Sequence, residues 1–132
     1  MEILITGGTG FIGRSLCQRL LGKSYQLTIL SRRPSFCSQL FNNEVRCVRT
    51  LDDIKASDHF DYVINLSGEP IADRRWSSER IKKLKESRIG ITQKLLSCFE
   101  RLDTKPIKLI SGSAIGFYGD KGSTLVDELT EP

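Results

Sequence analysis

The sequence predicts an α/β fold in which a doubly wound parallel sheet carries helices on both faces. Short apolar runs of β-type composition alternate with segments of helical periodicity, an alternation typical of βαβ units. The 132 residues, 39% hydrophobic and 27% charged, suit one domain with a single core. Because βαβ crossovers are right-handed, we expect the strand order 3-2-1-4-5.

The strands are predicted where short apolar runs end at turn residues. The expected strands are 2–6, 25–30, 44–48, 61–66 and 107–111. A sheet of this kind usually has a sixth strand, and without one the fifth is an edge with unpaired backbone groups. We therefore expect residues 1–132 to be the N-terminal part of a longer protein, with the sheet truncated after its fifth strand.

Helical spacing follows the first strand. Ile12, Leu16 and Leu20 recur every four residues, and Gly22 is expected to end this helix. A weaker helix is predicted over 35–41.

The longest helical pattern extends from Ile81 to Leu102, with apolar residues three and four apart. Ser77 or Ser78 can cap its start. Arg88 falls on the apolar stripe of this helix rather than on its charged face.

A glycine-rich segment, residues 6–13, lies directly between the first strand and the first helix. Gly8, Gly10 and Gly13 fit the pattern G-x-G-x-x-G, and Gly7, Gly10 and Gly13 fit the related G-x-x-G-x-x-G. In this context glycines allow a tight turn, a close approach of the backbone to a diphosphate, and close packing of helix on strand. The N–H groups at the start of the helix favour anions. The segment therefore predicts a dinucleotide site in a Rossmann-type domain.

The end of the second strand indicates which dinucleotide binds. An NAD-preferring site usually carries Asp or Glu about 20 residues after the glycines, but this segment is Ser31-Arg32-Arg33. Guanidinium groups can bind a 2′-phosphate through paired, charge-assisted hydrogen bonds. We therefore expect NADP as the cofactor, and the alternative is two solvated arginines at the start of a loop.

The charge, cysteine and histidine content argues against several other classes. The formal net charge of +4 comes without a basic stripe that would indicate nucleic acid. No apolar run approaches the ~18–20 residues that a membrane span needs. The four cysteines form no C-x-x-C pair and His59 is the only histidine, so we expect no metal site. Free thiols suit a reducing cytosol, and a cytoplasmic protein is expected.

Three segments together resemble the extended short-chain dehydrogenases/reductases: residues 6–13, residues 65–68 and the serine-rich end of the fifth strand. More narrowly, residues 65–76 and 110–120 resemble an atypical subfamily known as nucleotide-sugar epimerases or cell-division-inhibitor-like proteins. The resemblance implies an NADP(H)-dependent oxidoreductase or epimerase that exchanges hydride with a carbonyl or alcohol. We expect a small-molecule substrate and no nucleic-acid or membrane partner, with a homodimer left open.

The resemblance also implies a set of cofactor contacts and one catalytic residue. The implied cofactor-binding residues are Gly7, Thr9, Gly10, Phe11, Ile12, Gly13, Ser31, Arg32, Arg33, Leu66, Ser67, Gly68 and Arg88. Ser113 aligns with the serine that polarises the substrate oxygen in the superfamily's Ser–Tyr–Lys chemistry. The alternative for Ser113 is a turn hydroxyl that bonds its own backbone.

Two departures from the superfamily leave a second function open. The superfamily usually has Asn four residues before a helical Thr, where this chain has Arg88 before Thr92. The superfamily's Tyr-x-x-x-Lys pair does not occur within residues 1–132 and is expected beyond Pro132, but the subfamily that this chain resembles itself lacks a clear pair of this kind. The alternative is therefore a non-catalytic NADP-binding regulatory protein. Arg74, Arg75 and Trp76 also have two interpretations: they bind a phosphate-bearing substrate, or Trp76 anchors the loop beside two solvated arginines.

Overall fold

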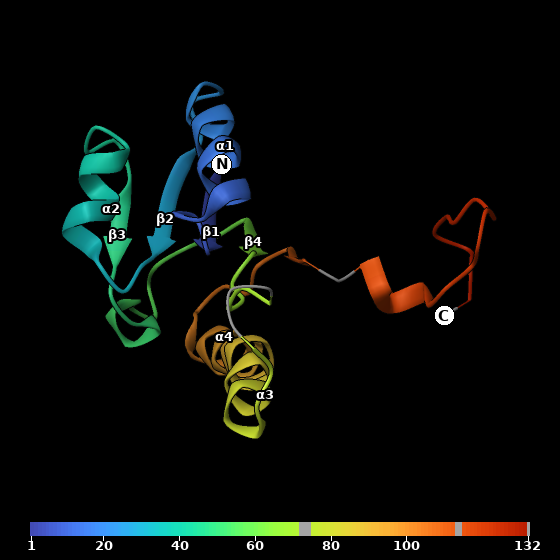
Figure 1. Ribbon diagram of the computed structural model, residues 1–132. Helices are drawn as coiled ribbons and strands as arrows, with labels where there is room; N and C mark the ends of the chain where they lie inside the picture. Colours follow the sequence, from blue (N-terminus) through green and yellow to red (C-terminus); the bar gives the residue numbers. More distant parts are fainter. Residues whose placement is uncertain (72–74, 113–114, 132) are drawn as a thin grey trace.

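A parallel β-sheet forms the centre of the computed structural model, which describes residues 1–71, 75–112 and 115–131 (Figure 1). Its five strands are β1 (Glu2–Thr6), β2 (Gln26–Leu30), β3 (Arg46–Val48), β4 (Tyr62–Asn65) and β5 (Lys108–Ser111). They lie in the order β3-β2-β1-β4-β5, and all neighbouring pairs are parallel. The predicted fold class and strand order are therefore confirmed.

Helical segments connect the strands, and one more follows β5. They are α1 (Phe11–Leu21), α2 (Pro34–Leu40), η1 (Leu51–Asp53), α3 (Ser78–Lys85), η2 (Glu86–Gly90), α4 (Ile91–Arg101) and η3 (Ile115–Tyr118). Ser77 caps α3, since its side chain accepts a hydrogen bond from the N–H of Arg80. The long helix predicted as one pattern is divided by η2, a wider turn with π-helical bonding.

The predicted strands 25–30 and 44–48 begin too early, because the N–H groups of their first residues are used in the preceding turns. The N–H of Tyr25 donates to the carbonyl of Leu20 and closes the turn after α1, so β2 begins one residue later. The N–H of Glu44 likewise donates to Phe41, and β3 begins only at Arg46. The short helices η1 and η3 were not predicted from the sequence.

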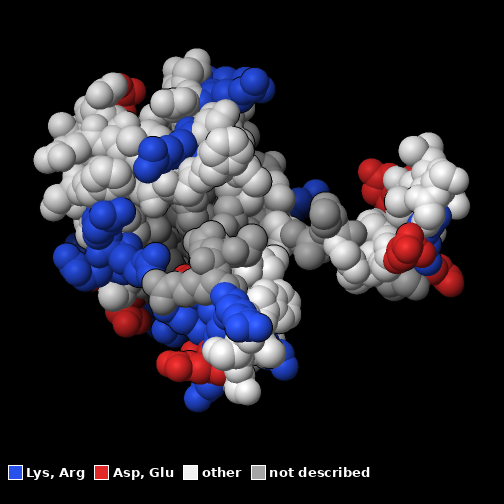
Figure 2. Space-filling view, viewed as in Figure 1, with Lys and Arg blue, Asp and Glu red and all other residues white. Residues whose placement is uncertain are grey.

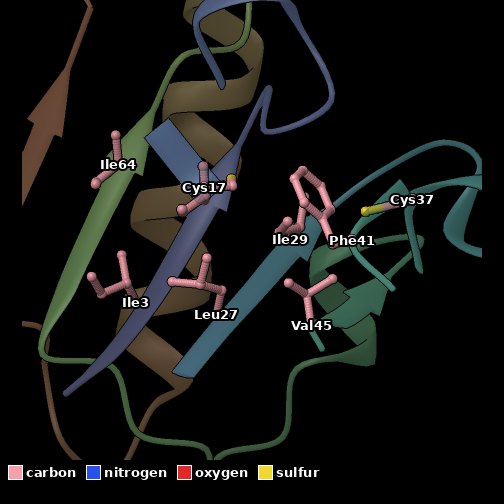
Figure 3. Packing of buried hydrophobic residues seen from close by; sticks show 9 residues of the cluster. Ile3, Cys17, Leu27, Ile29, Cys37, Phe41, Val45 and Ile64 are labelled. Carbon is pink, nitrogen blue, oxygen red and sulfur yellow. The ribbon is translucent and has the colours of Figure 1, made fainter. Parts of the chain in front are cut away.

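The core has two parts, one on each face of the sheet, because successive strand residues point to opposite sides. Ile3 and Ile5 of β1 pack with residues of α1, α2 and β2 in the cluster shown in Figure 3. Leu4 lies on the other face, with Leu51 of η1 and Leu95 of α4. Helical segments therefore cover both faces, as expected.

The cysteines are free thiols, and Cys17, Cys37 and Cys98 are buried in these two clusters. Burial raises the pKa of Cys17 to about 12, so its thiol stays protonated at neutral pH. These residues therefore act as small core hydrophobes.

The outer edge of β5 has no strand partner among residues 1–71, 75–112 and 115–131. Figure 1 shows the segment after β5 extending away from the sheet. In the described part of the chain, no helix combines the length and the apolar character that crossing a membrane requires.

Two neighbouring leucines of α4 test how the helix packs on the sheet. Leu95 is fully buried, whereas Leu96 is 50% exposed. We expect Leu95→Ala to lower the free energy of unfolding by about 2–5 kcal/mol, since it leaves a cavity against the sheet. Leu96→Ala is the matched control, with an expected change within about 1 kcal/mol. Urea denaturation measures both, and equal losses would contradict the described orientation of α4.

Candidate functional site

The carboxyl ends of three strands are held level by one buried asparagine. Thr6, Asn65 and Ser111 are register partners at the ends of β1, β4 and β5. The Oδ1 atom of Asn65 accepts from the hydroxyl of Thr6 at 2.6 Å, and its Nδ2 donates to the hydroxyls of Thr92 at 3.3 Å and Ser111 at 3.4 Å. Because Thr92 lies on α4, this network fixes the helix as well as the strands.

The glycine-rich turn lies directly above these strand ends. Gly7 has a φ of +72°, and a Cβ there would lie 2.5 Å from the carbonyl oxygen of Leu66. Gly13 of α1 rests on the turn itself, where a Cβ would lie 2.7 Å from the Cα of Gly8. Gly7 thus permits the turn, and Gly13 permits the close packing of helix on strand.

The first turn of α1 presents backbone N–H groups. Gly10 is the N-cap and makes no side-chain cap hydrogen bond, and the first turn holds no acidic residue. Gly10 lines the cavity, and a Cβ there would meet only the carbonyl oxygen of Gly7, at 3.2 Å. Bare backbone and the positive end of the helix dipole therefore lie together at this point.

A cavity of about 1060 Å³ lies at the carboxyl ends of the strands, where the strand order reverses between β1 and β4. Its volume is at the upper end of the range for small-molecule sites, about 300–1000 Å³. The turn after β1, the ends of β2 and β3, the segment after β4 and one side of α4 form its walls. Figure 2 shows the hollow with Lys and Arg side chains on both sides of it.

The end of β2 supplies polar and cationic groups to this cavity. Ser31 is buried, and its hydroxyl accepts a hydrogen bond from the N–H of Arg33. Arg32 and Arg33 are exposed and line the cavity. The guanidinium of Arg33 lies 4.7 Å from the centre of the Phe36 ring, which orients it by a cation–π contact.

The wide turn η2 is bonded to the segment that follows β4. The carbonyl of Leu84 accepts from the hydroxyl of Ser87 at 2.8 Å and from Arg88 at 3.2 Å. Ser87 in turn accepts from the N–H of Glu69, and Arg88 donates to the carbonyl of Glu69 at 3.1 Å. The guanidinium of Arg88 lies directly on Gly68. This explains why an arginine interrupts the apolar stripe: it packs on backbone.

An ion pair holds Glu69 at the cavity wall. Arg80, which is buried, donates to the carboxylate of Glu69 at 2.9 Å and also to the carbonyl of Pro70. Lys83 lies 3.7 Å from the same carboxylate. The hydrogen bond from Arg80 lowers the pKa of Glu69 below its ordinary value, with a further contribution from the charge of Lys83. Glu69 is therefore an ionised group at neutral pH.

The structure brings most of the predicted cofactor residues to the cavity. The predicted residues that line it are Gly7, Thr9, Gly10, Ser31, Arg32, Arg33, Leu66, Ser67 and Gly68. Gly13 lies beneath the turn, whereas Phe11 and Ile12 are exposed on the first turn of α1 and do not line the cavity. Arg88 contacts the backbone of the cavity wall instead of the cavity. Cofactor contacts by all thirteen residues stay predictions, whether or not the residue lines the cavity.

Two further predictions concern residues near the gaps in the description. Ser113 and Arg74 lie outside the described residues. The indole N–H of Trp76 donates to the carbonyl of Ile71 at 3.2 Å, which is the anchoring contact that one of its two interpretations expects. Among residues 1–71, 75–112 and 115–131, no group of three or more His, Cys, Asp or Glu side chains could hold a metal ion.

The sequence analysis missed several charged residues of the cavity. Arg49 follows β3, and Lys94 and Arg101 line the cavity from α4. The guanidinium of Arg101 donates to the carbonyl of Leu51 at 2.9 Å, close to Arg49 in the chain. A single arginine after a short strand is ordinarily a solvated residue, so only the strand register places Arg49 beside Ser31.

A family model described as "NAD dependent epimerase/dehydratase family" matches residues 3–132. Among relatives, the chain is 32% identical to the chloroplastic epimerase family protein SDR39U1 homolog of Arabidopsis thaliana, over 97% of this chain and 38% of the relative. It is also 32% identical to an epimerase family protein of Staphylococcus aureus, over 89% of this chain and 39% of the relative. The chain thus spans about two fifths of the length of these relatives.

Solved structures of epimerase proteins are also similar to this chain. Human epimerase family protein SDR39U1 (isoform 2), crystallised with NADPH, superposes with a TM-score of 0.72 at 28% identity. The match covers 89% of this chain and 38% of the human one. A UDP-glucose-4-epimerase from Stenotrophomonas maltophila with bound NAD has a TM-score of 0.77 at 17% identity, over 99% of this chain and 42% of that one, and shows the fold alone.

The glycine contacts generate a paired test of stability. We expect Gly13→Ala to lower the free energy of unfolding by about 1–3 kcal/mol, because its methyl group would push α1 off the turn. Gly90→Ala is the control, since no heavy atom lies within 4 Å of the added Cβ. In a helix this change is expected to stabilise by up to about 1 kcal/mol. Urea denaturation measures both, and equal effects would contradict the packing described.

The Glu69–Arg80 pair predicts a dependence on pH. Because the folded-state pKa of Glu69 is lowered, its stabilising contribution is present above its ordinary pKa of 4.5 and is lost as pH falls through the folded value. We therefore expect Glu69→Gln to destabilise the protein at pH 7, and the gap to wild type to narrow in acid. Glu44→Gln, at an exposed position without an ion pair in the described part of the chain, is expected to show little of either effect. If the difference in free energy of unfolding between wild type and Glu69→Gln does not change with pH, the ion pair between Glu69 and Arg80 is contradicted.

Proposed function

The chain belongs to the NAD dependent epimerase/dehydratase family, and we propose that it binds NADP(H) in the cavity at the ends of its strands. The proposed reaction, carried out by the whole protein, is hydride exchange with a carbonyl or alcohol substrate. A nucleotide sugar is the proposed substrate class. The observation that carries the proposal is the pairing of a bare helix start with an arginine-rich strand end in one cavity.

The diphosphate is placed at the first turn of α1. Gly7, Thr9 and Gly10 line the cavity directly before the first turn of α1. The N–H groups of that turn carry no side-chain cap, so they can bind phosphate oxygens without displacing a side chain. The fit is good at this point because a side chain on Gly10 would occupy the space beside the turn.

The preference for NADP over NAD is placed at the end of β2. Ser31, Arg32 and Arg33 line the cavity, and they include no carboxylate that would bind a free ribose hydroxyl or repel a phosphate. The human protein crystallised with NADPH, the structural neighbour described above that exceeds 25% identity, supports this choice.

Once bound, NADP(H) supplies the hydride donor or acceptor. The chain's own residues bind and orient it: the Asn65 network keeps the strand ends level, and Arg88 with Ser87 holds the Gly68–Glu69 backbone in place. Ser113 is proposed to orient the reacting oxygen of the substrate. A mass-spectrometric search for deuterium passed from labelled NADPH to the carbonyl carbon of keto-sugar nucleotides, with the whole protein, tests the reaction.

Arg32 tests the cofactor preference. We expect wild type to bind NADPH more tightly than NADH, and Arg32→Ala to weaken NADPH binding by about 1–3 kcal/mol while NADH binding is unchanged. Calorimetric titration measures both cofactors. Arg19→Ala on α1 is the control, because it removes the same charge and does not line the cavity. Equal affinity of wild type for NADPH and NADH would overturn the proposed preference.

A further inference from the structure

We propose that Arg49 is a further specificity-determining residue, whose guanidinium binds the 2′-phosphate of NADP together with Arg32. This inference rests on the proposed function, since it assumes that the 2′-phosphate lies at the end of β2. It adds a contact from a second strand, β3, that the sequence motif does not include.

The strand register places Arg49 next to the expected phosphate. Leu30 of β2 pairs with Val48 of β3, and the N–H of Ser31 then donates to the carbonyl of Val48 at 2.9 Å. The two strands therefore stay bonded up to their carboxyl ends. The residues that follow, Ser31 with Arg32 on one strand and Arg49 on the other, line the same cavity.

The backbone at Arg49 is held in place while its side chain is exposed. The carboxylate of Asp53 accepts from the N–H groups of Arg49 at 2.9 Å and Thr50 at 2.8 Å. These hydrogen bonds lower the pKa of Asp53, and the bond from Thr50 contributes most. Asp53 is therefore ionised at neutral pH. Only the side chain of Arg49 has to be ordered when a ligand binds, which limits the entropic cost of binding.

The cationic groups at this end of the cavity meet carboxylates of the described residues only at longer range: the charge of Arg32 acts on Glu69, and that of Arg49 acts on Asp53. In the described part of the chain, the guanidinium groups of Arg32 and Arg49 make no hydrogen bond or ion pair, whereas Arg46 on the same strand pairs with Asp58 at 2.8 Å. Asp52, which also lines the cavity, lies 3.6 Å from Arg101. A phosphate monoester carries a charge of about −1.5 to −2 at neutral pH, which two guanidinium groups can match.

The experiment compares adenosine fragments that differ in the position of one phosphate. Adenosine 2′,5′-bisphosphate and adenosine 3′,5′-bisphosphate carry the same charge, so their ratio of affinities reports the 2′ contact and not the general field. We expect wild type to bind the 2′,5′ isomer more tightly than the 3′,5′ isomer. We expect Arg49→Gln to lower the affinity for the 2′,5′ isomer by about tenfold or more, and to change the affinity for the 3′,5′ isomer much less. Calorimetry on the full chain measures both.

The controls separate this inference from its premise. Arg19→Gln, which changes the net charge equally away from the cavity, is expected to leave the ratio unchanged. Arg49→Lys keeps the charge and is expected to lie between wild type and Arg49→Gln. In the double variant with Arg32→Gln, the loss of binding free energy for the 2′,5′ isomer is expected to be smaller than the sum of the losses in the two single variants, because both groups bind one phosphate.

Each outcome decides a separate point. The role of Arg49 is overturned if Arg49→Gln leaves the ratio of the two affinities unchanged, and equal weakening of the binding of both isomers is such a case. This conclusion holds whether or not Arg32→Gln lowers the ratio. If wild type shows no preference for the 2′,5′ isomer, the proposed placement of the phosphate fails and Arg49 loses its role with it. Circular dichroism of each variant confirms that the fold is retained.

Discussion

The site depends on the close contact between α1 and the turn after β1, where neither partner carries a side chain. Gly7 turns against the carbonyl of Leu66, and Gly13 rests on the backbone of Gly8. Because nothing separates helix from strand, the N–H groups at the start of α1 lie at the level of the strand ends. The phosphate-binding role that we propose for the turn therefore depends on packing, and it needs no charged side chain within the turn itself.

The opposite wall of the cavity is held by hydrogen bonds that side chains make with other side chains and with backbone. Asn65 joins β1, β4, β5 and α4, and Ser87 with Arg88 joins η2 to the segment after β4. These groups are mostly withdrawn from the cavity, so they set the shape of the wall and leave its chemistry to Glu69, Ser67 and the basic residues. One wall thus presents exposed backbone amides to the cavity, and the other wall is held in position by internal hydrogen bonds.

The sequence was sufficient for the strand order and for the glycine turn, since both depend on local patterns and on the handedness of crossovers. It was insufficient where a tertiary hydrogen bond decides the structure. Tyr25 reads as a strand residue, but its N–H closes the preceding helix. The turn η2 is hidden in a regular apolar spacing, because its cause is the contact of Ser87 and Arg88 with Glu69. Arg49 carries no motif, and only the pairing of β2 with β3 brings it to the cavity.

The wide turn η2 has a consequence for how this protein can vary over evolution. The turn η2 itself already holds one residue more than an α-helical turn. An α-helix rotates by about 100° per residue, so losing or gaining one residue within the α-helical part before it, Ser78–Lys85, would rotate Leu95 and Cys98 of α4 away from the sheet. Side chains on the outer surface of this helix are free to be exchanged, but its length is fixed by two ends that are both anchored. Comparisons among its relatives should therefore find substitutions here far more readily than insertions or deletions.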